Sequence, residues 1–169
     1  VGDDYQGFFG YNSGTVSNFK AEGEIYGTGK YTGGVAGYSS GTLNGLTFIG
    51  KISATGEMSD YTGGVVGYST GAAGASAGLV FGNASELSDN KVTNPTSIVT
   101  GHDYVGGIAG YSAGAISNSK NYGRVTGADR VGGIAGAALS AVSSNISYAP
   151  VNASKDYAGG IVGHHSENA

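Results

Sequence analysis

The chain contains no cysteine and no tryptophan, only two prolines, and few charged residues among its 169 positions. The lack of cysteine excludes disulfide bonds and thiolate metal sites, so the fold has to be held together by packing. With 8 basic against 12 acidic residues there is no basic patch that could neutralise a run of phosphates, and we expect no nucleic-acid binding. No apolar run approaches the roughly 18 residues of a membrane span, so no membrane insertion is expected.

Glycine, by contrast, occupies 34 positions, about three times its average share of roughly 7%. Collagen is excluded, because glycine does not stand at every third position and proline is scarce. The glycines occur at fixed places among valine, isoleucine and tyrosine, whereas a flexible low-complexity chain would scatter them. This regularity predicts a packed structure.

An eight-residue pattern, YVGGIAGY at residues 104–111, recurs along the whole chain. Close copies stand at 31–38 and 61–68, and looser copies at 4–11, 130–137 and 157–164. Successive copies are 27, 30, 43, 26 and 27 residues apart when measured at the second glycine: Gly7, Gly34, Gly64, Gly107, Gly133 and Gly160. A period of 20–50 residues is typical of solenoids, propellers and repeat arrays.

Each repeat consists of three short β-type segments separated by small-residue corners. Valine, isoleucine, threonine and tyrosine fill the segments, and no window has the apolar spacing of a helix. The sequence therefore predicts an all-β fold, a parallel β-solenoid of about six coils of roughly 27 residues with three strands each. A right-handed winding is expected from the strong preference of parallel crossovers. We interpret residues 1–169 as a single repeat domain, part of a longer protein, with an inserted loop at about 81–97.

Stacked coils would place equivalent residues in columns. The residue after the paired glycines is apolar in all six copies and predicts an inward core column of Phe8, Val35, Val65, Ile108, Ile134 and Ile161. The third segment predicts a second column of Ile25, Ile52, Val99, Val125 and Val151. The middle segment predicts a third column of Val16, Leu43, Ile116 and Val142.

Aspartate stands four residues before the second paired glycine in five copies, at Asp3, Asp60, Asp103, Asp129 and Asp156. A carboxylate ladder of this kind could bind calcium along the rod. The alternative, which we favour, is a corner aspartate that accepts backbone N–H bonds in a turn. The GGxGxD repeats of calcium-binding β-rolls are absent.

Two tyrosine columns are predicted, one of Tyr31, Tyr61, Tyr104 and Tyr157 and the other of Tyr11, Tyr38, Tyr68 and Tyr111. Exposed rings could stack on sugars or on a partner protein, whereas half-buried rings would cover the corners of the coil. We favour packing. His102, His164 and His165 lack the spacing of a known ligand motif. The sequence predicts no catalytic residues, no cofactor-binding residues and no metal site, and hence no enzyme; a β-helical lyase or hydrolase would require clustered charged residues on one face.

The signature GG[VI][AV]GY, followed by a turn glycine and an SNS-like segment, resembles the GLUG repeat. The resemblance covers essentially the whole chain and is strongest for the copies that begin at Tyr31, Tyr61, Tyr104 and Arg130. The first copy departs at Gln6, and the last two copies lack the closing tyrosine. This family occurs in secreted and surface-anchored bacterial proteins, including adhesin-like proteins and zinc metallopeptidases that cleave immunoglobulin A. The resemblance carries over no catalytic residue.

We therefore expect a structural or adhesive segment of an extracellular or cell-surface bacterial protein, acting as a rigid spacer or interaction scaffold. Its expected partners are flanking domains of the same protein or identical subunits stacked end to end, and host glycans or host proteins are further candidates. The alternatives are a carbohydrate-binding module that uses the tyrosine columns or the 81–97 loop, and a self-stacking filament subunit. Bare terminal strands would favour continued stacking.

Overall fold

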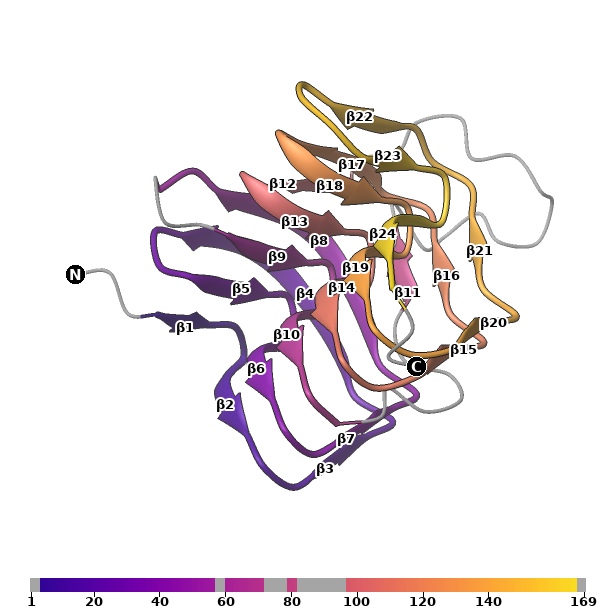
Figure 1. The fold of residues 1–169 in the computed structure, drawn as a ribbon. Coiled ribbons are helices and arrows are strands. Elements are labelled where there is room, and N and C mark those ends of the chain that lie inside the picture. The colour runs from indigo at the N-terminus through magenta and orange to yellow at the C-terminus, as the bar shows by residue number, and fades with distance from the viewer. Residues whose placement is uncertain (1–3, 57–59, 72–78, 82–96, 167–169) are drawn as a thin grey trace, which may run out of the picture.

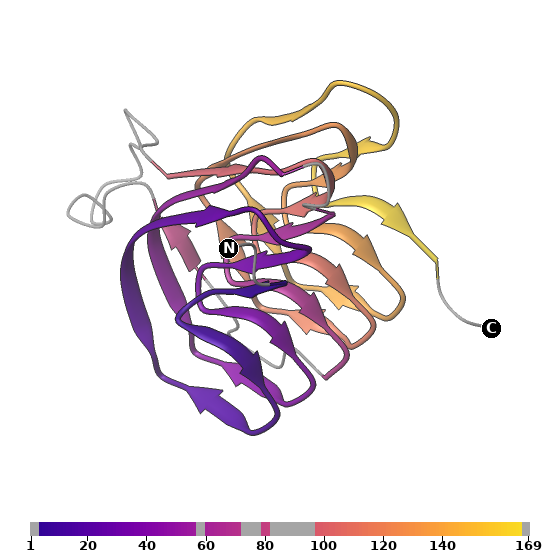
Figure 2. The ribbon, with the colours of Figure 1, turned by 90° about the vertical axis from the view of Figure 1, so that its left-hand side faces the viewer.

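The computed structural model describes residues 4–56, 60–71, 79–81 and 97–166, and for 79–81 only the backbone. Strands are the only regular elements in these ranges, and this part of the chain has no helix that could cross a membrane. Successive turns of the chain lie one beside another in both ribbon views (Figures 1 and 2), and every strand pair is parallel. The fold is an all-β solenoid with about 27 residues per turn, as the repeat predicts, and it has about five turns where about six were expected.

Three long sheets run along the solenoid. The first sheet contains one strand from each of the six signature copies: β1 (Tyr5–Gln6), β5 (Tyr31–Gly33), β9 (Tyr61–Gly63), β13 (Asp103–Gly106), β18 (Asp129–Gly132) and β23 (Ala158–Gly159). The second sheet contains the other half of each copy: β2 (Phe9–Asn12), β6 (Ala36–Ser39), β10 (Val66–Ser69), β14 (Ala109–Ser112), β19 (Ala135–Ala138) and β24 (Val162–His165).

The third sheet is formed by the segments that follow the middle of each repeat. In chain order its strands are β4 (Lys20–Gly27), β8 (Thr47–Ala54), β11 (Leu79–Phe81), β12 (Ile98–Thr100), β16 (Lys120–Asn121), β17 (Arg124–Gly127), β21 (Ile146–Ser147) and β22 (Val151–Ala153). Two small sheets form a corner of the coil: β3 (Thr15–Ser17) with β7 (Thr42–Asn44), and β15 (Ile116–Ser117) with β20 (Val142–Ser143).

Each signature copy makes two strands where the sequence suggests one, because the chain bends at the paired glycines. A Cβ atom on Gly33 would lie 2.0 Å from the carbonyl oxygen of Ala36, and one on Gly34 would lie 2.4 Å from Cγ of Phe48. These glycines are needed for close approach, since φ is positive at neither of them; the described glycines with positive φ are Gly23, Gly45 and Gly50.

In the first copy, the strand before the bend is offset by one residue from the alignment of the paired glycines, whereas the strand after the bend follows that alignment. Tyr5 is paired with Tyr31, and Phe9 with Ala36. Only two residues separate Gln6 from Phe9, where three separate Thr32 from Ala36. The bend of the first copy is thus one residue shorter, and Tyr5 joins the first tyrosine column.

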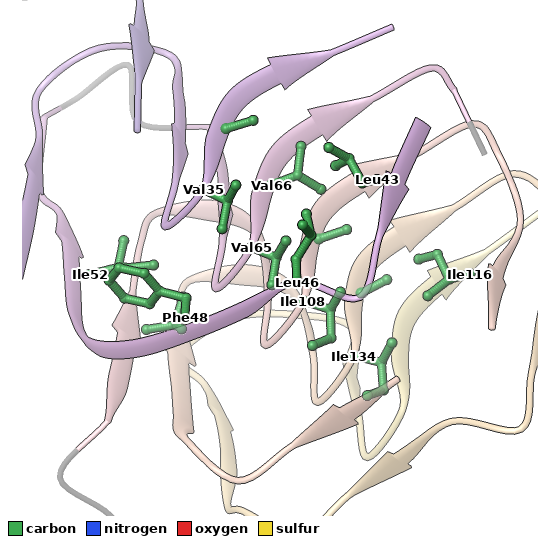
Figure 3. Packing of buried hydrophobic residues seen from close by; sticks show 14 of the residues in the cluster. Val35, Leu43, Leu46, Phe48, Ile52, Val65, Val66, Ile108, Ile116 and Ile134 are labelled. Carbon is green, nitrogen blue, oxygen red and sulfur yellow. The ribbon is translucent and has the colours of Figure 1, made fainter. Parts of the chain in front are cut away.

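The inward column of the signature lies in the centre of the molecule (Figure 3), where Val35, Val65, Ile108 and Ile134 have no solvent exposure. Backbone N–H groups of Val35, Val65 and Ile108 each donate to the carbonyl of the next member of the column, at 2.9 Å. The two terminal members differ from the sequence prediction. Phe8 is 58% exposed and Ile161 37%, because each lies in an end coil that no further coil covers.

The other two predicted columns are also in register. Ile25, Ile52, Val99, Val125 and Val151 pair in turn along the third sheet, and the three central members are fully buried. In the corner sheets Val16 pairs with Leu43, and Ile116 with Val142. The repeat pattern did not indicate Leu46 and Phe48, which are fully buried beside these columns (Figure 3).

The predicted insertion at about 81–97 interrupts the third sheet. Phe81 pairs with Ile49, and Ile98 pairs with Lys51, so the chain leaves and rejoins the same register on β8. The N–H group of Gly50 donates to Oγ of Ser97 at 3.3 Å. The body of the predicted loop, residues 82–96, lies outside the described residues.

Candidate functional site

Tyrosine rings form two stacked columns on neighbouring sheets. In the first column the ring centroids are 5.2 Å apart for Tyr5–Tyr31, 5.3 Å for Tyr31–Tyr61 and 4.9 Å for Tyr61–Tyr104. In the second column they are 5.2 Å apart for Tyr11–Tyr38, 5.4 Å for Tyr38–Tyr68 and 4.5 Å for Tyr68–Tyr111. The rings are near parallel, with interplanar angles between 5° and 23°. The 4.8 Å or so between paired strands sets this spacing.

Edge-to-face contacts connect the two columns. Tyr31 meets Tyr38 at 5.9 Å and Tyr68 at 5.5 Å, with interplanar angles of 78° and 76°. Tyr61 meets Tyr68 and Tyr111 in the same way, at 5.1 and 5.9 Å. Four rings, those of Tyr31, Tyr38, Tyr61 and Tyr68, therefore have two stacked and two perpendicular aromatic neighbours each. Such pairs stabilise by about 0.5–1.5 kcal/mol each beyond area burial.

This arrangement limits what the columns can bind. A sugar stacks on the face of an aromatic ring, and both faces of Tyr31, Tyr38, Tyr61 and Tyr68 are covered by the rings of adjacent coils. These four rings are half-buried, as are Tyr104 and Tyr111. The more exposed rings belong to the end coils: Tyr5 at 44%, Tyr11 at 58% and Tyr157 at 54%.

Arg130 replaces tyrosine in the first column between Tyr104 and Tyr157. Its guanidinium carbon lies 4.8 Å from the centroid of Tyr104 and 5.4 Å from that of Tyr157, so cation–π contacts continue the stack. Asp129 binds the same guanidinium group. In the second column Ala137 stands below Tyr111 and is 2% exposed, and His164 follows it, edge-on to Tyr157 at 5.7 Å.

Burial raises the pKa of two phenols in the columns, Tyr68 and Tyr61. The pKa of Tyr68 is raised to about 12, mainly by burial and then by the neighbouring tyrosines Tyr111, Tyr61 and Tyr38. The pKa of Tyr61 is raised for the same reasons, with Asp60 contributing. The hydroxyl groups of Tyr61 and Tyr68 are therefore harder to deprotonate than that of an ordinary tyrosine, and they can exchange hydrogen bonds with a partner.

The aspartates predicted to form one ladder do not share one environment. Asp129 Oδ1 accepts a hydrogen bond of 2.9 Å from the N–H of Arg130, which is the backbone contact closest to the predicted turn role. Asp103 is paired with Asp129 in register and lies beside His102. Asp156 is exposed, and Asp3 lies outside the described residues.

Asp60, His102 and Asp103 form a group that the sequence analysis did not assemble. Each offers one ligand atom, and these atoms lie within 4.8 Å of one another. His102 Nδ1 is 3.2 Å from Asp103 Oδ1, without the directionality of a hydrogen bond, and this oxygen is buried with no hydrogen-bond partner among the described residues. Adjacent column positions bring Asp60 beside Asp103, which the aspartate spacing could have indicated.

The other two histidines are further along the solenoid, on the last strand of the second sheet. His164 is stacked edge-on against Tyr157, and the Nε2 atom of His165 lies 3.1 Å from the carbonyl oxygen of Ser140. Within the described residues, the Asp60 group is the one set of three side chains placed to hold a metal ion.

Comparisons of the chain with models of known protein families, with curated proteins and with solved structures found no match.

Proposed function

We propose that this chain is a non-catalytic β-solenoid segment of a secreted or cell-surface bacterial protein, which serves as a rigid spacer or protein-interaction scaffold. The main support for this proposal is that aliphatic columns inside and tyrosine columns at the surface run through the same coils in register. In columns of this kind the stability of each coil depends on its contacts with the neighbouring coils, so single coils have little freedom to move independently. The resemblance of the signature to the GLUG repeat supports the bacterial and extracellular part of the proposal.

Native-state hydrogen exchange of the isolated chain tests the rigid-scaffold proposal. Amides of β9, β10, β13, β14, β18 and β19 should exchange together and slowly, because they belong to one cooperative stack. Strands of the end coils, such as β1 and β24, should exchange faster. Rapid and independent exchange of the interior strands would contradict a rigid spacer.

The carbohydrate-binding alternative receives less support from the interior tyrosine columns, because their ring faces are covered. A glycan array on the wild-type chain and on Tyr68→Ala separates the two proposals. Saturable glycan binding that Tyr68→Ala abolishes, with the fold retained by circular dichroism, would favour the binding module. Binding that is absent or unaffected by this change keeps the spacer proposal, and the 82–96 segment can then be deleted to locate any remaining affinity.

End-to-end stacking, with identical subunits or with flanking coils, is a second candidate role. The exposed members of the columns favour it: Phe8 and Tyr11 in the first coil, and Tyr157 and Ile161 in the last, could be covered by a further coil. Sedimentation velocity at increasing concentration should then show growth of a linear series of species. Tyr11→Glu, which places a charge in the end stack, should suppress that growth, whereas a monomer at all concentrations would contradict self-stacking.

A further inference from the structure

The three side chains of Asp60, His102 and Asp103 come from two adjacent coils. Asp60 precedes β9, while His102 and Asp103 lie at the start of β13, and β9 and β13 are neighbours in the first sheet. In sequence the two coils are separated by the segment that contains the insertion. The group therefore joins the part of the solenoid before the insertion to the part after it.

Backbone pairing does not extend to this corner. The register between β9 and β13 comprises Thr62↔Val105 and Gly63↔Gly106 and goes no closer to the N-terminal ends of the two strands. The next pair along the sheet, β13 and β18, is already paired at Asp103↔Asp129. Tyr104, Arg130 and Tyr157 have positive φ, whereas Tyr31 and Tyr61 do not, so the corner changes conformation between β9 and β13.

The charge environment of the carboxylates also differs from one coil to the next. Asp129 binds the guanidinium of Arg130, but the corresponding residue after Asp103 is Tyr104, which has no charge to offer. Among the described residues Asp103 Oδ1 is buried without a hydrogen-bond partner, and the His102 ring and the Asp60 carboxylate lie nearby. Lys30, the counterpart of Asp60 in the preceding coil, has its Nζ over the Tyr31 and Tyr61 rings at 5.7 and 6.0 Å. A bound ion is one way in which such an unpartnered carboxylate oxygen is satisfied.

We propose that Asp60, His102 and Asp103 bind a first-row divalent transition-metal ion, of which Zn²⁺ is the working example, and that this ion fastens the coils on either side of the insertion. One imidazole nitrogen and two carboxylate oxygens form a mixed donor set that suits Zn²⁺, whereas Ca²⁺ takes six to eight oxygens. Bond lengths of about 2.0–2.2 Å place neighbouring ligand atoms roughly 3.3–3.5 Å apart, close to the 3.2 Å between His102 and Asp103.

The rest of the site is compatible with metal entry. The His102 side chain is 45% exposed and that of Asp103 29%, so solvent reaches one side of the group. Asp60 is half-buried, and its ligand atom lies within 4.8 Å of the other two, so metal binding requires its carboxylate to move closer. With three protein ligands, water would complete a tetrahedral shell.

The test is zinc titration of the tag-free chain by isothermal calorimetry, with Co²⁺ absorption as an independent report on the ligands. We expect one saturable Zn²⁺ site per chain and a rise in melting temperature on binding. His102→Ala should weaken Zn²⁺ binding by at least about tenfold, as expected for loss of a group that contacts the metal. This substitution introduces the residue that the next coil has in the same register, Ala128, so the fold should tolerate it.

The matched controls are His164→Ala and His165→Ala, which copy Ala137 and Ala138 of the preceding coil and should leave Zn²⁺ affinity unchanged. Asp103→Asn tests the carboxylate and should also weaken binding. Lack of a saturable Zn²⁺ site in the wild type overturns the proposal. So does binding that survives His102→Ala but is lost in His164→Ala, or a preference for Ca²⁺ that His102→Ala does not alter.

Discussion

Interior and terminal coils of this solenoid carry equivalent side chains with very different burial. Ile108 and Ile161 occupy the same column, yet Ile108 is fully buried and Ile161 is 37% exposed. The tyrosine columns differ in the same way, since Tyr68 is stacked on both faces and Tyr11 on one. Position in the stack, rather than residue type, decides how much a side chain contributes to the stability of the fold, because a coil is covered only by its neighbours.

Substitutions at the paired glycines should show the largest difference in the free energy of unfolding between interior and end coils. A Cβ atom on Gly34 would meet the carbonyl oxygen of Gly64 at 2.3 Å and the Phe48 ring at 2.4 Å, whereas one on Gly160 would meet nothing within 4 Å. We expect Gly34→Ala to lower the free energy of unfolding by about 3 kcal/mol or more, and Gly160→Ala by less than about 1 kcal/mol. Urea denaturation followed by circular dichroism measures both, and equal losses would refute the close-approach role.

The aliphatic column should show the next largest difference. Ile108→Ala removes a fully buried side chain and should cost about 3 kcal/mol through lost burial and a cavity. Ile161→Ala removes a partly exposed side chain of the end coil and should cost about 1 kcal/mol. Thermal denaturation of the two variants ranks them, and a larger loss for Ile161→Ala would argue against the assigned stacking order.

Substitutions in the tyrosine columns should show a smaller difference in the free energy of unfolding than those in the aliphatic column. Tyr68→Ala removes two stacked and two perpendicular ring contacts, and should cost about 2 kcal/mol. Tyr11→Ala removes one stacked and one perpendicular contact and should cost about 1 kcal/mol. If the urea midpoints of both variants equal that of the wild type, the tyrosine columns do not stabilise the fold, and a binding role gains support.

A stabilising change is expected at a buried threonine. Thr62 is fully buried, its hydroxyl has no hydrogen-bond partner among the described residues, and its partner in the next coil is Val105. Thr62→Val replaces that hydroxyl with a methyl group, and should raise the free energy of unfolding by about 1 kcal/mol. Thr42→Val, at an exposed position, is the control and should give no gain by the same denaturation assay.

The smallest effect is a dependence of stability on alkaline pH. The pKa of Tyr68 rises from 10.0 to about 12 in the folded chain, so folding favours the neutral phenol. The stabilisation is complete below pH 10 and is lost as pH rises toward 12. Ultraviolet titration should show a late-ionising tyrosine that disappears in Tyr68→Phe. An unchanged titration curve in this variant would assign the late phenol elsewhere.

The repeat spacing was sufficient to predict the solenoid and its three aliphatic columns, because every coil repeats the same apolar positions. It could not show the bend at Gly33–Gly34, which depends on how closely the chain approaches Phe48 in a segment with its own pattern. Nor could it show that the bend of the first copy is one residue shorter, since the glycine alignment places Phe9 opposite Ala36 correctly but Tyr5 opposite Thr32 instead of Tyr31.

The candidate sites were predicted less completely than the fold. Both tyrosine columns follow from spacing, but the continuation through Arg130 required the geometry of the guanidinium between two rings. The Asp60, His102 and Asp103 group escaped notice because His102 has no counterpart in the other coils and therefore does not appear as a column.

The most direct test of the stacked, in-register arrangement is a disulfide engineered across the insertion. Ser53 on β8 pairs with Thr100 on β12, although the whole insertion lies between them in sequence, and the chain has no cysteine of its own. Ser53→Cys with Thr100→Cys should oxidise to an intramolecular disulfide in the native protein, since paired strands bring the two Cα atoms within bonding range. The control, Lys51→Cys with Thr100→Cys, is two residues out of register and should remain reduced. Failure of the first pair, or equal oxidation of the second, would contradict the account.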